Sequence, residues 1–206
     1  MHGTFRIGHF WSNIPSYETR GQCNRCQTTE DMSHILITCT TGTASQVWHL
    51  AQNAWPHAPE FWPNISLGII LAGGSIATPE EDETPQDDDE SEDDQERAQK
   101  KSDKRGRDRL LQILISEAAH LIWVTRCERV INERSHAEEE IKTRWLKAIN
   151  LRLTEDKIIA TKIRRAKTSI KLVKSTWAKV LQRQGPIPWD WIHQREVLVG
   201  RRVHTP

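Results

Sequence analysis

Four side chains of types that commonly bind metal ions lie within seventeen residues, and they constrain this chain more than any other sequence feature. They are Cys23, Cys26, His34 and Cys39. The two-residue spacer of the first pair lets both sulfur atoms face one ion, and three thiolates with one imidazole complete a tetrahedral ligand set for Zn²⁺. Because no coordination position is left for a water molecule, the sequence predicts a structural zinc site that does no hydrolysis.

The second half of this site falls on a predicted short helix. Apolar residues recur at helical spacing around His34, and a glycine follows Cys39 by three residues. Ligands five residues apart lie about 140° apart around an ideal helix. We therefore expect the last turn to loosen near Cys39.

The cysteines could also have either of two roles without a metal. The thiols could be buried beside an incidental histidine, or they could form two disulfides in a secreted chain. Since the sequence shows no signal peptide, we expect reduced thiols. Cys127, about ninety residues downstream in an apolar run, is expected to be a core thiol.

Residues 23–39, with residues 46–48, resemble the zinc-binding region of reverse transcriptases from non-LTR (LINE-like) retrotransposons. That family shows a CxxC pair, a short acidic turn, a His-Ile/Leu-Leu-x-x-Cys helix and a Val-Trp pair, and all four ligands match. Residues 5–15 are similar to the lead-in found where this region follows a ribonuclease H domain. Residues 122–131 resemble a downstream Ile-Trp-x-x-Arg-x-x-x-x-Ile helix, except that Cys127 replaces the expected asparagine.

The resemblance implies a carboxy-terminal region that handles template RNA or target DNA. Polymerase and ribonuclease H chemistry would then belong to upstream domains of longer relatives, and those domains of the same element are candidate protein partners. It also implies an intracellular protein. The lysines and arginines of residues 100–109 could serve as a nuclear-import or phosphate-binding patch, or they could simply belong to a solvated linker. We expect a nuclear location.

Charge is divided unevenly along the chain. Residues 80–96 contain twelve Asp and Glu and no Lys or Arg, whereas residues 97–206 contain twenty-six Lys and Arg against twelve Asp and Glu, a net charge of +14. These two segments should have different partners. No apolar run reaches eighteen residues, so we predict no membrane span.

A long segment between the two halves has little to bury. Residues 79–106 contain one apolar residue, Ala98, which cannot offset the conformational entropy lost on ordering. We therefore predict a disordered acidic and basic linker at 76–106. It separates a zinc-binding module at 1–75 from a basic helical domain with an irregular tail at 107–206, in a mainly α fold.

The zinc-binding module should gain its core from segments on both sides of the ligands. The apolar side chains of residues 1–22 are expected to pack against the site. Residues 44–55 predict a helix with a broad apolar face, and Pro56 ends it. For residues 62–75 a strand and a short helix fit equally well.

Three long helices are predicted for the second half. Residues 107–134 are apolar on nearly every side, as expected of a central core helix. Ser135 with Glu138 is typical of a capping box at the start of the next helix. The third helix should run from Thr154 to Gln184, with a tail that crosses the bundle.

The predicted third helix carries the candidate nucleic-acid-binding residues. Its apolar residues between Ile159 and Val180 follow spacings of four and three, which predicts one continuous apolar face. Nine cations without any Asp or Glu lie off that face: Lys157, Lys162, Arg164, Arg165, Lys167, Lys171, Lys174, Lys179 and Arg183. Like charges at this density repel one another, and the repulsion lowers stability unless a bound anion offsets it. The pattern therefore indicates phosphate binding.

Each surface of this helix also has an alternative use. The cations could contact only the chain's own acidic segment. The apolar face could form a coiled-coil dimer, although packing within a monomer is favoured because a core helix is available nearby.

The sequence contains no phosphate-binding glycine loop, nucleophile elbow, metalloprotease pair or Tyr-x-Asp-Asp segment. We therefore predict that the chain is not an enzyme. Two hypotheses remain. One is a zinc-binding, nucleic-acid-binding tail of a retrotransposon reverse transcriptase. The other is a zinc-stabilised helical domain for protein–protein interaction. Such a domain could be a domesticated or decayed fragment of an element.

Overall fold

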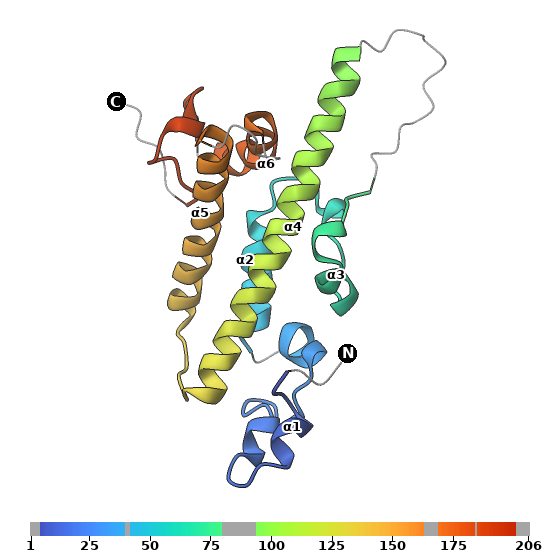
Figure 1. Ribbon diagram of the computed structural model, residues 1–206, viewed down its shortest axis with the longest axis vertical. Helices are drawn as coiled ribbons and strands as arrows, with labels where there is room; N and C mark the ends of the chain where they lie inside the picture. The colour runs from blue at the N-terminus through green and yellow to red at the C-terminus, as the bar shows by residue number, and fades with distance from the viewer. Residues whose placement is uncertain (1–4, 40–41, 80–93, 163–168, 184, 201–206) are drawn as a thin grey trace.

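The computed structural model describes residues 5–39, 42–79, 94–162, 169–183 and 185–200. Within these ranges every regular element is a helix, and the single β-type pairing is an isolated bridge between Gln22 and Thr29. The predicted mainly α fold class is confirmed (Figure 1). The α-helices are α1 (His9–Ser12), α2 (Thr43–Ala54), α3 (Leu67–Ala72), α4 (Asp94–Ile131), α5 (Glu138–Lys162) and α6 (Ile170–Gln182).

The long helix α4 is the centre of the structure, as predicted for residues 107–134. Its apolar positions face several directions, and α2, α5 and α6 all contact it. Leu110, Leu111, Leu114 and Ile115 are almost fully buried between these helices. A helix that is apolar on several sides needs such neighbours, which explains its central place.

By length and composition, the segment Gln95–Ile131 of α4 could also cross a membrane. In its most apolar eighteen-residue window, however, 56% is buried inside the protein. This is the pattern of a core helix in a soluble protein.

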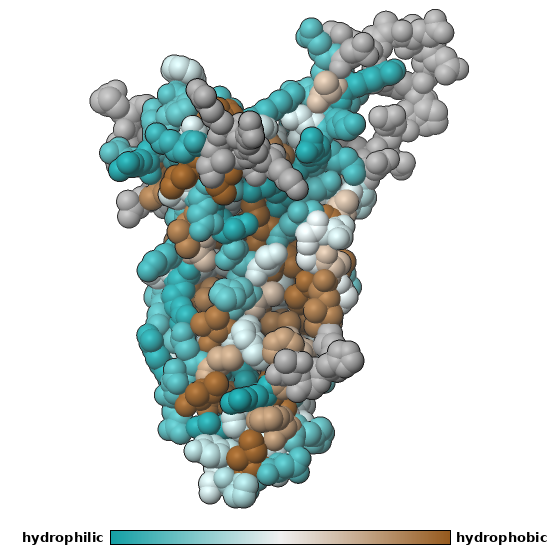
Figure 2. Space-filling view, viewed as in Figure 1, coloured by the Kyte–Doolittle hydropathy of each residue, from teal (hydrophilic) through white to brown (hydrophobic). Residues whose placement is uncertain are grey.

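α4 begins twelve residues before the predicted end of the linker, which corrects that prediction for residues 94–106. Side-chain pairs four residues apart support these exposed turns, including Glu96 with Lys100 and Gln99 with Asp103. Extending an existing helix costs much less than starting one, so a segment with few apolar residues can continue a core helix. These turns project beyond the other helices and have a hydrophilic surface (Figure 1, Figure 2). Residues 80–93 of the predicted linker lie outside the described residues.

The linker is also shorter at its other end, because residues 76–78 pack on α4. Gln112 donates a hydrogen bond of 2.8 Å to the Ile76 carbonyl oxygen. The Thr78 amide and hydroxyl both donate to Asp108 Oδ1, at 2.8 and 2.6 Å. Ile76 and Thr78 are buried, so the chain stays attached to the core up to this point.

A single hydrophobic core spans the boundary predicted between the zinc-binding module and the helical domain. Leu36 and Val47 from the first part lie in the same buried cluster as Ile122, Trp145 and Trp177 from the second. The two parts are therefore packed together rather than joined only by a linker.

In the first part, α2 matches the predicted helix to within one residue at each end. The segment for which strand and helix fitted equally well forms the helix α3. Ser66 caps it, since its hydroxyl oxygen accepts a hydrogen bond of 3.2 Å from the Ile69 amide.

The predicted division between the second and third helices is wrong. α5 continues through Thr154 to Lys162, and α6 begins only after Ser169, whose hydroxyl oxygen accepts from the Leu172 amide. Thr154 does not cap a helix, because its hydroxyl donates to the Asn150 carbonyl one turn earlier. The continuous helix from Thr154 to Gln184 is therefore two helices, and residues 163–168 of it lie outside the described residues.

The predicted capping box and apolar face are corrected in the same region. α5 begins at Glu138, so Glu138 is its first residue and not the third, as a capping box requires. Of the predicted apolar face, Val173, Trp177 and Val180 are buried on α6, whereas Ile170 is 40% exposed.

Asp156 connects α4, α5 and α6. Asp156 lies two residues after Thr154, so the predicted third helix would make it an exposed carboxylate of the first turn. The structure instead buries it within α5, where it is 3% exposed. It accepts two hydrogen bonds from the Arg109 guanidinium, at 2.5 and 2.6 Å, and one of 2.7 Å from the Trp177 indole. Three donors satisfy the buried charge.

The C-terminal tail packs on α5, as expected. Trp191, Ile192 and Val197 are buried, and a 3₁₀-helix spans Trp191–His193. Asn150 on α5 donates to the Val199 carbonyl and accepts from the Val199 amide, at 3.0 and 2.7 Å.

The close crossing of α4 and α6 gives a test of this packing. A Cβ atom at Gly106 would lie 2.5 Å from the backbone carbon of Ser175. Gly106→Ala should therefore force the helices apart and lower the free energy of unfolding by about 1–3 kcal/mol, as overpacking does. Urea denaturation measures this change.

Gly74→Ala is the matched control, because its Cβ would meet nothing within 4 Å. That variant should be as stable as the parent or slightly more stable. Equal stability of both variants would contradict the crossing.

Candidate metal centre

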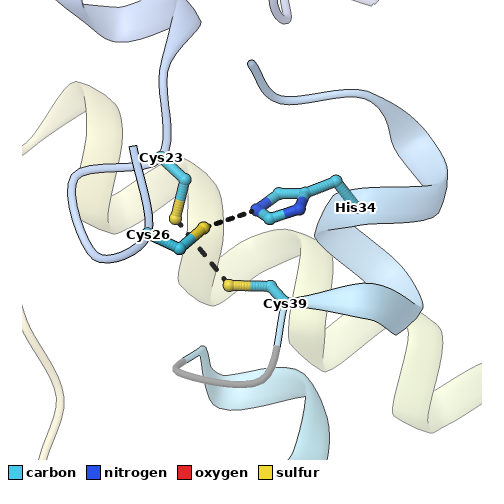
Figure 3. Close-up of side chains that lie close together, drawn as sticks. All are labelled: Cys23, Cys26, His34 and Cys39. Carbon is cyan, nitrogen blue, oxygen red and sulfur yellow. Dashed lines mark hydrogen bonds between the residues drawn. The ribbon is translucent and has the colours of Figure 1, made fainter. Parts of the chain in front are cut away.

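The first two ligand candidates lie on a tight turn. The Gln27 amide donates to the Cys23 carbonyl, and the Cys23 amide donates to the Thr28 carbonyl, both at 2.8 Å. Gln27 has a φ of 59°, in the left-handed region that such a turn requires. The turn directs the sulfur atoms of Cys23 and Cys26 to the same side (Figure 3).

The other two candidates lie at opposite ends of a π-helix, His34–Thr38. The carboxylate of Asp31 accepts a hydrogen bond of 2.6 Å from the His34 amide at its start. The Cys39 amide donates across five residues to the His34 carbonyl, at 3.0 Å. This wider turn reduces the angle between residues five apart, so the predicted loosening is confirmed.

The four ligand atoms lie within 4.8 Å of one another. Cys23 Sγ is 3.7 Å from Cys39 Sγ, and Cys26 Sγ is 3.4 Å from His34 Nε2 (Figure 3). Tetrahedral Zn²⁺ with bonds of about 2.3 Å to sulfur and 2.0 Å to nitrogen separates these pairs by about 3.8 and 3.5 Å. A disulfide requires about 2.05 Å. The group therefore fits one metal ion and does not fit a disulfide.

The surroundings also suit a metal centre that is closed to solvent. Cys23, His34 and Cys39 are buried, and only Cys26 is partly exposed. Hydrogen bonds from the side chain and backbone of Thr28 lower the pKa of the Cys26 thiol, which favours the thiolate that binds metal. A Cβ atom at Gly42 would lie 3.0 Å from Cys39 Sγ, so the chain after the site passes close to this ligand.

A buried ion-pair network joins this centre to α4. Glu30, which is 2% exposed, accepts two hydrogen bonds from Arg126, at 2.8 and 2.5 Å, and one of 2.8 Å from Arg129. Arg129 also donates to Asn24 within the Cys23–Cys26 turn. The metal centre is thus held to the core helix through its acidic turn.

This network was not predicted from the sequence, although a signal was present. Arg126 lies within an apolar run, and an arginine at such a position is rarely buried without a partner. Cys127, next to it, is half-buried and lies outside the metal-binding group, which corrects its assignment as a core thiol.

Two of the nine predicted nucleic-acid-binding cations bind carbonyl groups of the chain itself. Lys157 is buried and donates to the carbonyls of Gln194 and Val197, and burial lowers its pKa. Arg183 donates at 2.9 Å to the carbonyls of Asn53 and Trp55 at the end of α2.

The other seven cations fall into two groups. Lys162, Lys171 and Lys179 are exposed, and Lys174 is half-buried. Arg164, Arg165 and Lys167 lie outside the described residues.

Comparisons with known proteins add no identification. No protein-family model matches the chain, and neither the curated proteins nor the solved structures contain a match.

Metal analysis tests the centre directly. The purified chain should bind about one Zn²⁺, and Cys26→Ser should remove most of it because three ligands hold the ion far less tightly. Chelation should lower the melting temperature of the parent.

Cys127→Ser is the matched control, since this thiol is not part of the group. It should keep the metal content of the parent. Undiminished zinc in Cys26→Ser would rule out the assignment.

The Glu30 network gives a second prediction. Glu30→Ala leaves two arginines, Arg126 and Arg129, without their carboxylate, and should lower the free energy of unfolding by about 3–5 kcal/mol. Glu139→Ala, at an exposed carboxylate on α5, should change it by less than about 0.5 kcal/mol. A small effect of Glu30→Ala in urea denaturation would show that the metal centre is held mainly by other contacts.

Proposed function

We propose that this chain is a non-catalytic, zinc-binding and nucleic-acid-binding region of a retrotransposon-type reverse transcriptase. Support for the family comes from the contacts between the three segments that resemble it. Arg126, from the Ile-Trp-x-x-Arg segment, binds Glu30 in the acidic turn between the ligands. Phe5, from the lead-in, stacks edge-on against Trp123 at 5.3 Å. Three separate similarities are thus parts of one structural unit.

The metal in this proposal is Zn²⁺, and its role is structural. Three sulfur ligands and one imidazole suit zinc better than hard cations such as Mg²⁺ or Ca²⁺. When bound, the ion would hold the Cys23–Cys26 turn against the π-helix. All four ligand positions would be filled by Cys23, Cys26, His34 and Cys39, so hydrolytic chemistry is not proposed.

The nucleic-acid-binding surface in this proposal centres on α6. The observation that supports it is that every charged residue of this helix is positive. Ile170–Gln182 contains three lysines and no carboxylate. Lys171 and Lys179 are exposed, and among the described residues neither forms a salt bridge. Since like charges on one helix cost stability without an anion, phosphate groups of template RNA or target DNA are the proposed ligands.

The apolar side of α6 supports a monomer. Val173, Trp177 and Val180 are buried against the chain's own core, so this face is not available for a coiled coil. A nuclear location follows from the proposed function, since target DNA is nuclear.

A groove beside the metal centre favours the alternative function, a domain for protein–protein interaction. It encloses about 680 Å³ between the π-helix, α2 and residues 62–65. Its wall includes the ligand Cys39, the half-buried Trp48 and Trp62, and the polar side chains of His49, Gln52 and Asn64. Polymerase or ribonuclease H domains of the same element are the partners proposed for this surface.

A charge-reversal experiment separates these functions. Lys171→Glu/Lys179→Glu should weaken binding to all nucleic acids. If both lysines contact phosphates, the slope of log K against log salt should become less steep by about 1.4 for a single strand and 1.8 for a duplex. Fluorescence anisotropy over a salt series measures both quantities.

The matched control is Lys142→Glu/Lys147→Glu, which makes the same charge change at exposed positions of α5. It should keep most of the affinity and the slope of the parent. If the two double variants bind alike, the effect is one of net charge and the protein-interaction function is favoured.

A further inference from the structure

The nine tryptophans of this chain are exposed to very different degrees. Eight of them are buried or half-buried, including Trp191, which is 3% exposed. Trp189 is 87% exposed, two residues away in the same tail. Trp189 therefore offers nearly its whole indole surface to an external partner.

The backbone that carries this indole is anchored on both sides. Pro186 and Pro188 restrict the chain before it, and the Pro188 carbonyl accepts a hydrogen bond of 3.1 Å from the Trp191 amide. Trp191 and Ile192 anchor the following turn in the core. The Asp190 carboxylate is engaged with His193 at 2.5 Å. Trp189 is thus held outward by an ordered turn.

The tail that carries Trp189 lies at the same end of the molecule as the lysines of α6. Both α6 and the 3₁₀-helix of the tail contact α5, and Figure 1 shows all three together near the C-terminus. The exposed cations of this end include Lys162, Lys171 and Lys179. An exposed indole and exposed cations at one end of the molecule supply the two chemistries that single strands require, stacking for the bases and charge for the phosphates.

We propose that Trp189 is a stacking platform for an unpaired base, and that the ligand of this surface is single-stranded RNA or DNA rather than a duplex. The inference rests on the proposed function and specifies its substrate. In a duplex the base faces are covered by their stacked neighbours, so a surface indole cannot stack on them. In a single strand every base has an open face, and stacking on it does not depend on sequence.

The test compares Kd values for oligo-U, oligo-dT and a duplex of the same length at fixed salt. Trp189→Ala should weaken binding to either single strand by about 5- to 150-fold, the usual loss for one stacked base. Duplex binding should change by less than about twofold. The salt slope should be unchanged, because no phosphate contact is removed.

Two further variants serve as controls. Trp189→Phe keeps an aromatic face and should retain most of the affinity for single strands. Leu71→Ala removes an apolar side chain on α3 that is 59% exposed, and it should leave the Kd values for all three nucleic acids unchanged. Because Trp189 makes little contact with the core, melting temperatures should match that of the parent.

A second measurement does not depend on affinity. In protein labelled with 5-fluorotryptophan, Trp189→Phe identifies the ¹⁹F resonance of this residue, and oligo-U should shift that resonance more than the other eight. An unshifted resonance, or equal losses for single strands and duplex in Trp189→Ala, would overturn the proposal. If the lysine reversals weaken binding and Trp189→Ala does not, the stacking inference alone fails. If neither change affects binding, the proposed function fails with it.

Discussion

The buried carboxylate of Glu30 is the interaction on which the arrangement of this protein depends. The segment around the metal centre is too short to form a core of its own, and short segments of this kind need a metal or a larger core to stay folded. Glu30 supplies the connection, because Arg126 and Arg129 reach it from α4. A metal ion held by the four ligands would fix the local fold, and the ion pair, together with Leu36 in the shared core, positions that fold on α4. Neither contact does both.

The same device recurs near the middle of α4. Asp156 on α5 binds Arg109 on α4 and Trp177 on α6, so one buried carboxylate orients three helices. Buried charges of this kind add little net stability compared with apolar residues, but removing one partner is costly. They therefore select one packing of the helices over others. Between the two carboxylates lies the apolar part of α4, which provides most of the buried surface.

Features that depend on neighbouring residues could be predicted from the sequence, and features that depend on distant partners could not. Ligand spacing predicted the group formed by Cys23, Cys26, His34 and Cys39, and the offset of the last two predicted a loosened turn. Apolar periodicity predicted α2 to within one residue. The end of α5 was predicted wrongly because the position of Asp156 after Thr154 is typical of a first-turn carboxylate. Its true role depends on Arg109, which lies forty-seven residues earlier in the chain and binds it.

The roles of the cations in the predicted basic helix also depend on distant partners and could not be predicted from the sequence. Sequence alone gave all nine one role, whereas the fold uses Lys157 and Arg183 to satisfy carbonyl groups of the tail and of α2. Each can do so because an ammonium or guanidinium has several donors and a long apolar stem. Of the nine, the described cations left for a ligand are therefore Lys162, Lys171, Lys174 and Lys179. A surface with so few phosphate contacts binds nucleic acid weakly by charge alone. Such a surface needs a second source of affinity, and in the described part of its C-terminal end the exposed indole of Trp189 is the group with that capacity.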